Sequence, residues 1–322
     1  MHEMDTDEEL VPGHAQAVGE TLRAILRGLH ETMQDNVRGA REGAAPKYLH
    51  DFRVALRRTR TVISRLRGAL PSGVRDRFAS EFKWLGAVTG DVRDLDVHLS
   101  QLPAHAAALP DGVGADMARL GRHLERQRAA AQQKLNESLS SARYRDLTTG
   151  WRSFLEQLPA DYGPDAPDAL RPVKEVASVQ IWRIYCECLE RAQTIDERTA
   201  DEELHELRKD CKKLRYLLEF FRHLFPPADM DRSIGALKKL QDVLGSFNDL
   251  SMQRQAICRL RSELQHESAV SEPTRVVADL LMARLEEWLT EERGRFQAAF
   301  TGFASEKVDE RFRQLFASDP LR

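Results

Sequence analysis

The sequence predicts an all-α protein made of two pseudo-symmetric four-helix bundles that arose by internal duplication. Three observations lead to this prediction. The 322 residues are rich in Ala, Leu, Arg and Glu, which favour helices, and contain few β-branched or aromatic runs. Apolar residues recur at helical spacing between short segments that contain Pro or Gly. Two stretches of the chain, one in each half, also carry the same pattern of residue types.

The repeated pattern consists of two motifs. In the first motif a His is followed by basic residues three, seven, eight and ten positions later, at 50–60 and again at 205–215. The offset between the copies is 155 residues (205 minus 50). The second motif has the same offset without a gap, since Gly90, Asp94 and Leu95 correspond to Gly245, Asp249 and Leu250. Agreement of both motifs indicates a duplicated unit of helices.

The first repeat is expected at residues 13–160. Its first helix covers about 14–40, with Leu22, Leu26 and Leu29 at helical spacing. The second helix begins near Pro46, where a missing N–H costs no helical hydrogen bond, and ends before Pro71. A third helix is expected at 74–100, stopped near Pro103. Two further helices are expected at 112–139 and 142–158.

The second repeat is expected at residues 168–300, after a linker at 163–167 that contains Gly and Pro. Thr199 and Glu202 resemble a capping box at the start of its basic helix, and Pro226 follows that helix. Its helices are expected at 171–196, 200–225, 228–265 and 272–300. Residues 1–12 are interpreted as an acidic flexible tail and 301–322 as a C-terminal helix or tail.

The composition limits the class of protein. The formal net charge of −3 argues against a protein that coats nucleic acid by bulk attraction, so any affinity for polyanions must come from local clustering of cations. The four cysteines have neither disulfide-framework nor zinc-site spacing, which favours reduced thiols. The N-terminal residues have no apolar core of a signal peptide, and no stretch is apolar enough to span a bilayer. A cytoplasmic protein without membrane contact is therefore expected.

The two basic segments place their cations on one face of each helix. Each residue of a helix advances by about 100°, so Arg53, Arg57 and Arg60 fall on one stripe about 100° wide. Phe52 and Leu56 belong to a separate apolar stripe beside it. The ordinary interpretation of such a stripe is a solvated charged surface. However, residues 47–67 contain seven cations and one acid, and the arrangement occurs twice. We therefore favour a groove that binds a polyanion between the two repeats.

These motifs resemble those of the CHAD family, an α-helical domain named for its histidines. The match rests on the basic motif at 50–60 with Gly-x-x-Arg-Asp-Leu-Asp-Val at 90–97, and on its second copy at 205–216 with Leu-Gln-Asp-Val-Leu-Gly at 240–245. The resemblance covers about residues 10–300. It implies two helical bundles around a basic central cavity, binding of inorganic polyphosphate and, in some members, association with polyphosphate granules. Independently of the resemblance, the motifs of the sequence lead us to expect no cofactor and no metal site.

The resemblance and the repeated stripe assign the same binding residues. Guanidinium groups bind phosphate oxygens with two parallel hydrogen bonds, Lys adds point charge, and His can donate a hydrogen bond. The resulting candidates are His50, Arg53, Arg57, Arg58, Arg60, His205, Arg208, Lys209, Lys212, Lys213 and Arg215. Weaker candidates, which lie further along the same helices or near the second motif, are Arg67, Lys83, Arg222, Lys238 and Lys239.

Two other functions stay open at this point. Asp94, Asp96 and Asp249 could serve a metal-assisted phosphohydrolase or phosphotransferase, although pairing with nearby cations is the favoured interpretation of these acids. The chain has no phosphate-binding loop or hydrolase motif. Many members of the family that it resembles carry a triphosphate-processing CYTH domain upstream, and we expect none before the first helix here. We therefore expect that the protein is not an enzyme. The same basic face could bind nucleic acid, but it lacks interleaved aromatic residues for base stacking. The expected partners are polyphosphate and, through it, granule proteins or a separate polyphosphate enzyme.

Overall fold

The computed structural model describes residues 16–317 apart from 111, 158–162, 197 and 267–271. The described chain is almost entirely helical, which confirms the all-α prediction, and its only β-type pairing is an isolated bridge between Ala17 and Pro172. The first half contains α1 (Val18–Glu42), α2 (Pro46–Arg65), η1 (Arg67–Ala69), α3 (Ser72–Val88), α4 (Gly90–Ala107), α5 (Gly114–Ser140) and α6 (Ala142–Gln157). The second half contains η2 (Gly163–Asp165), α7 (Val173–Gln193), α8 (Asp201–Phe220), η3 (Arg222–Leu224), α9 (Pro227–His266), α10 (Glu272–Phe303) and α11 (Glu306–Phe316).

Helix boundaries recur at the offset found in the sequence. Both ends of α2 and α8 differ by 155 residues, as do both ends of the 3-10 turns η1 and η3. The starts of α1 and α7, and of α3 and α9, differ by the same number. Pro46 occupies the first turn of α2, as expected for a residue that lacks an N–H. The duplicated order of elements is thus present, while the two-fold axis that would relate the repeats stays a prediction.

The prediction of one helix over 74–100 was wrong. The chain forms two helices there, α3 and α4, which are separated at Thr89. The carbonyl of Leu85 accepts both the backbone N–H of Thr89, at 3.2 Å, and the Thr89 hydroxyl, at 2.8 Å, where α3 ends. Pro103 does not stop α4, which continues to Ala107. A proline removes one helical hydrogen bond, and α4 stays helical through this position where it packs against α5.

The capping box predicted at Thr199 and Glu202 was also wrong. The residue that precedes α8 is Ala200, and no side chain caps the helix. The Thr199 hydroxyl instead bonds to Asp196, from which it accepts the backbone N–H at 2.9 Å. The first turn of α8 carries three acids, Asp201, Glu202 and Glu203, which interact favourably with the positive end of the helix dipole.

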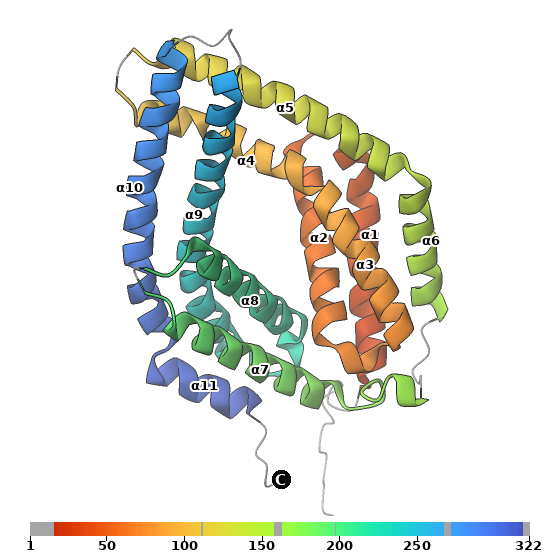
Figure 1. Ribbon diagram of the computed structural model, residues 1–322. Coiled ribbons are helices and arrows are strands. Elements are labelled where there is room, and N and C mark those ends of the chain that lie inside the picture. The colour runs from red at the N-terminus through yellow and green to blue at the C-terminus, as the bar shows by residue number, and fades with distance from the viewer. Residues whose placement is uncertain (1–15, 111, 158–162, 197, 267–271, 318–322) are drawn as a thin grey trace, which may run out of the picture.

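Figure 1 shows how the helices are arranged. On one side α1, α2, α3 and α6 pack against one another, and on the other side α7, α8, α11 and the first part of α9 do so. The helices α4 and α5 reach from the first group to α10, where Leu120, Leu281 and Leu285 belong to a small separate core. The main core is continuous and includes buried residues of both halves, such as Phe52 and Tyr185. The two halves therefore share one hydrophobic core.

The C-terminal region, for which a helix or a tail was expected, forms the helix α11. Its apolar face buries Phe312 and Phe316, while Arg313 and Gln314 are exposed. The ring of Phe312 stacks on Tyr185 of α7, with ring centroids 4.0 Å apart. This helix consequently belongs to the same core as α7 and α8. The predicted acidic tail, residues 1–12, lies outside the described residues.

The two basic helices are neighbours in space. α2 and α8 contact each other, and Arg58 of α2 forms an ion pair with Glu219 of α8. The Arg58 guanidinium also lies over the ring of Tyr216, 5.3 Å from its centroid. These contacts tie the two repeats together beside the basic residues of both. Within the described residues, no helix has the length and apolar character needed to cross a membrane.

Candidate anion-binding cavity

A cavity of about 710 Å³ opens where the two basic helices meet. Residues of α2, η1, α3, α7 and α8 form its wall. None of the wall residues is Asp or Glu, and the nine charged ones are Arg57, Arg60, Arg65, Arg67, Lys83, Arg183, Lys209, Lys212 and Lys213. The surface is thus strongly positive although the protein as a whole carries a net charge of −3. A low-dielectric wall lined by one sign of charge concentrates counter-ions of the opposite sign.

The helical spacing of the sequence explains how cations reach this wall. Phe52 and Leu56 are buried in the core, which fixes the rotation of α2 about its axis. Arg57 and Arg60 lie on the neighbouring face and are therefore turned toward the cavity. In α8 the buried Leu207 and Leu214 hold the helix in the same way, and Lys212 comes to the wall. The position of the basic stripe beside the apolar stripe is what places it at the edge of the core.

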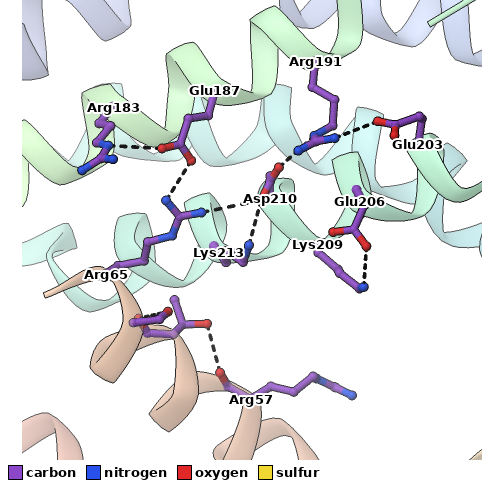
Figure 2. Close-up of polar contacts among 12 residues, drawn as sticks. Arg57, Arg65, Arg183, Glu187, Arg191, Glu203, Glu206, Lys209, Asp210 and Lys213 are labelled. Carbon is purple, nitrogen blue, oxygen red and sulfur yellow. Dashed lines mark hydrogen bonds and ion pairs between the residues drawn. The ribbon is translucent and has the colours of Figure 1, made fainter. Parts of the chain in front are cut away.

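Four of the nine wall cations are neutralised by acids behind them (Figure 2). Arg65 donates to Glu187 of α7 at 2.8 Å, and its other terminal nitrogen lies 3.6 Å from Asp210 of α8. Arg183 pairs with Glu187 at 3.2 Å, and Lys213 pairs with Asp210 at 2.8 Å. These bonds form one continuous network across α2, α7 and α8.

The network continues away from the cavity. Asp210 also accepts from Arg191 at 3.1 Å, and Arg191 in turn pairs with Glu203 at 2.7 Å. Lys209, the fourth paired cation of the wall, donates to Glu206 at 2.7 Å. The buried Asp210 thus pairs with cations of α2, α7 and α8 and fixes two of the wall cations, one from α2 and one from α8, in place.

The other five wall cations have no acid within ion-pairing distance among the described residues. They are Arg57, Arg60, Arg67, Lys83 and Lys212. In Figure 2 the side chain of Arg57 extends away from the paired network, and the only bond drawn at this residue ends on its backbone oxygen. The guanidinium of Arg60 lies against Gly86, where an added Cβ would be 2.8 Å from its nitrogen. A larger residue there would have to displace the flexible end of Arg60, so glycine permits this close approach to the α3 backbone.

The unpaired charges act on one another. The pKa of Lys212 is lowered to about 7, mainly because the amine is buried, and additionally because Arg208 and Arg57 are close. The pKa of His50 is lowered by burial and by the nearby Arg93, Arg57 and Lys212. For both groups, burial and the surrounding cations outweigh the effect of a nearby carboxylate, so the pKa is lowered. The protein therefore folds with an uncompensated cluster of cations at this wall.

Several of the candidate residues hold the cavity together without lining it. Arg58 bonds to Glu219 across the helix pair, and Arg215 bonds to the same carboxylate at 2.7 Å. Arg53 donates to the carbonyl of Gly86 at 3.1 Å and to the hydroxyl of Thr89 at 2.9 Å. Burial lowers the pKa of Arg53 to about 10, which leaves it charged at neutral pH. Arg53 thereby fastens α2 to the break between α3 and α4.

The remaining candidates also lie outside the cavity wall. His205 is hydrogen-bonded to Asn248 of α9, while His50 lies at the surface with its imidazole partly buried. Arg208 lies 3.8 Å from Asp249, and Arg222 pairs with Asp231 at 2.6 Å. Lys238 and Lys239 are exposed on α9. Of the sixteen candidates, seven line the cavity: Arg57, Arg60, Lys209, Lys212 and Lys213 from the main group, and Arg67 and Lys83 from the weaker group.

The three candidate catalytic acids lie next to arginines. Asp249 pairs with Arg208, and Asp96 pairs with Arg128 of α5 at 2.6 Å. Asp94 lies near Arg53, which opposes the increase in its pKa that burial causes. Pairing with cations, the favoured interpretation of these acids, is confirmed for Asp96 and Asp249, although the partner of Asp96 lies on α5 and not on a basic helix. No group of His, Cys, Asp and Glu in the described part of the chain is arranged to hold a metal ion.

Sequence reasoning missed two cations of the wall, Arg65 and Arg183. The duplication could not reveal them, because the position 155 residues after Arg65 holds Phe220 and the position 155 residues before Arg183 holds Gly28. Arg183 lies on α7, outside both basic motifs. The run of cations between residues 47 and 67 includes Arg65 and was the one available signal for it.

Comparisons with known proteins agree with this architecture. The family model for the CHAD domain matches residues 24–258. The fold is similar to the crystal structure of the CHAD domain from the plant Ricinus communis, with a TM-score of 0.73 and 23% identity over 93% of this chain and 97% of that one. It is also similar to PptA from Streptomyces chartreusis, with a TM-score of 0.69 and 17% identity over 89% and 100% of the two chains. The comparison with curated proteins found no match. At these identities the two structures share the fold alone.

Proposed function

The chain belongs to the CHAD domain family, and we propose that the cavity between α2 and α8 binds inorganic polyphosphate without changing it chemically. One observation carries this proposal. Five cations of one cavity wall, Arg57, Arg60, Arg67, Lys83 and Lys212, have no acidic partner in the described structure. Both basic motifs resemble those of the CHAD family, and this resemblance implies polyphosphate binding. It therefore supports the choice of polyphosphate as the ligand.

The unpaired cations are suited to a polymer of phosphate groups. Guanidinium groups such as those of Arg57 and Arg60 can bind phosphate oxygens with two parallel hydrogen bonds, and Lys212 adds a compact charge. Like charges held together in a partly buried site are costly to the folded protein. A bound polyanion reduces the repulsion among these cations. Part of the favourable free energy of binding therefore comes from removing a repulsion that destabilises the free protein.

The cavity is poorly suited to single-stranded nucleic acid. Proteins that bind such strands without sequence preference stack bases on aromatic side chains. Tyr216 is the only aromatic residue among those that line the cavity, and its side chain is 8% exposed. Arg58 already lies over the Tyr216 ring. A phosphate chain without bases needs no such platform, which favours polyphosphate over nucleic acid.

Titration calorimetry with long-chain polyphosphate at several salt concentrations tests the proposal. If the five unpaired cations contact phosphate groups, the plot of log K against log salt concentration is expected to have a slope of about −3.5, or about 0.7 for each cation. Single-stranded DNA serves as the parallel ligand and is expected to bind much more weakly. Equal affinity for both polymers would reduce the cavity to a general anion patch, and absence of binding would refute the proposed function.

A non-catalytic role is expected because the acids that could act on phosphate are occupied. Asp96 and Asp249 pair with arginines, and neither they nor Asp94 line the cavity. Incubation of polyphosphate with the protein and Mg²⁺ should therefore leave the chain length unchanged on a gel and release no phosphate. Mg²⁺-dependent release that disappears in Asp94→Asn would instead establish the phosphohydrolase alternative.

In a cell, binding of this kind would act in the cytoplasm, at polyphosphate granules or next to a separate enzyme of polyphosphate metabolism. Because the proposed contact is made through the cavity alone, a variant that has lost polyphosphate binding in solution would also lose this location. In such an assembly the protein binds the polymer directly, and it associates with other proteins because they bind the same polymer.

A further inference from the structure

We propose that polyanion binding in this cavity is coupled to the uptake of one proton by the Lys212 amine, so that the protein holds its ligand more tightly at neutral than at alkaline pH. This inference rests on the proposed function and adds its regulation by pH. It depends on where Lys212 lies: on the wall of the cavity, among cations that come from two helices.

The surroundings of Lys212 contain more positive than negative charge. From α8 itself, Arg208 and Arg215 are close, and from α2 Arg57 and His50 are within electrostatic reach. The acid that acts on Lys212 from α9 is Asp249, whose side chain is 46% exposed and lies 3.8 Å from Arg208. No ion pair to Lys212 occurs within the described structure.

The next residue along the helix provides a contrast. Lys213 donates to the carboxylate of Asp210 at 2.8 Å and therefore already has a counter-charge. Lys212 faces the cavity with no such partner. A counter-charge for Lys212 can thus come from a ligand, and an anion in the cavity is the chemical class that supplies one.

The sign of the coupling follows from this arrangement. In the free protein, burial and neighbouring cations lower the pKa of Lys212 to about 7, so the amine loses its proton as the pH rises above neutrality. Phosphate oxygens next to the amine favour its charged form and raise the pKa toward the ordinary value of 10.5. Between these two values the complex holds one proton more than the free protein, and affinity falls as pH rises. Below pH 7 the lysine is charged in both states, and its contribution to pH dependence disappears.

His50 is a second group that can gain a proton on binding, and the choice of pH separates it from Lys212. Its pKa lies below the ordinary value of 6.5, because of burial first and of neighbouring cations second. A bound anion moves that pKa upward, so His50 contributes mainly in the acidic range. Measurements above pH 7.5 therefore report chiefly on Lys212.

The test is titration calorimetry of the full chain with long-chain polyphosphate at pH 7.5 and 8.5, in pairs of buffers that differ in ionisation enthalpy. The affinity is expected to fall roughly eightfold over this interval, with uptake of close to one proton at the higher pH. Lys212→Arg keeps its charge throughout this range, so it should bind more tightly than the wild type at pH 8.5 and lose both effects. Lys307→Arg, at an exposed position of α11 outside the cavity wall, is the matched control and should retain both the fall in affinity and the proton uptake.

The outcomes separate the inference from the function on which it rests. Binding without pH dependence in the wild type, or equal pH dependence in Lys212→Arg, would overturn proton coupling and leave polyphosphate binding standing. Absence of binding even at pH 6.5 would overturn both. A ¹³C NMR titration of lysine Cε in the free protein, assigned with Lys212→Arg, adds an independent readout: a lysine that titrates near pH 7 supports the inference, and an ordinary value near 10.5 contradicts it.

Discussion

Reversing the charge of Arg57 and Lys212 together, in the variant Arg57→Glu/Lys212→Glu, is expected to weaken polyphosphate binding at least about 100-fold. Each charge-assisted hydrogen bond contributes about 1.5–3 kcal/mol, and about 1.4 kcal/mol corresponds to a tenfold change in affinity. The substitution removes two such donors and adds two negative charges to a wall that has none. Titration calorimetry at low salt measures the effect, and circular dichroism checks that helicity is retained.

The matched control is Lys238→Glu/Lys239→Glu, which changes the net charge of the protein by the same amount. Both lysines are exposed on α9 and lie outside the cavity wall. If binding depends on the local cluster, the control should bind with nearly the affinity of the wild type. If both variants lose affinity equally, the protein attracts polyphosphate through its overall field, and the assignment to this cavity is wrong.

Replacing Phe312 by Ala is expected to lower the free energy of unfolding by about 3–5 kcal/mol, the usual cost of removing a buried aromatic ring. Phe312 is completely buried and stacks on Tyr185, which itself packs edge-on against Phe303. Loss of the ring leaves a cavity between α7 and α11 and removes an aromatic pair. Denaturant unfolding followed by circular dichroism measures the change.

Gln314→Ala serves as the control for this substitution. Gln314 is exposed on the opposite face of α11, where it bonds only to Glu310 of the same helix, so its removal should change stability by less than about 0.5 kcal/mol. If Phe312→Ala were as mild as Gln314→Ala, α11 would be an appendage and not a part of the core. A large effect of Phe312→Ala would show that the last helix helps to hold α7 in position. Because α7 carries ion-paired residues of the cavity wall, α11 would then also support the cavity.

The helices and the basic face could be predicted because they depend on local patterns. The period of apolar residues defined α2 and α8, and the repeated offset anticipated that their boundaries would correspond. The break at Thr89 could not be predicted, because the corresponding position in α9 is Leu244 inside a continuous helix, and the two segments share most of their motif. The hydroxyl of Thr89 bonds to the carbonyl of Leu85, a contact that the leucine at the corresponding position of α9 cannot make.

The candidate site was predicted only in part for a related reason. A helical wheel places Arg57 and Arg60 on one stripe, but it cannot tell whether an acid of another helix reaches them. In the folded protein Glu187 and Asp210 reach Arg65, whereas no described acid pairs with Arg57 or Arg60. Arg183 lies in the wall because α7 packs beside α8, and the internal repeat gives no sign of it.

The amino-acid sequence by itself determined most of the helices, the repeated motifs and a basic face beside each apolar face, since these properties arise from local patterns of residues. Only the tertiary structure decided which cations share a cavity, which of them are neutralised and which are left for a ligand. Ion pairing falls off within a few ångströms, and the distance between side chains on α2, α7 and α8 is set by how their buried faces pack together.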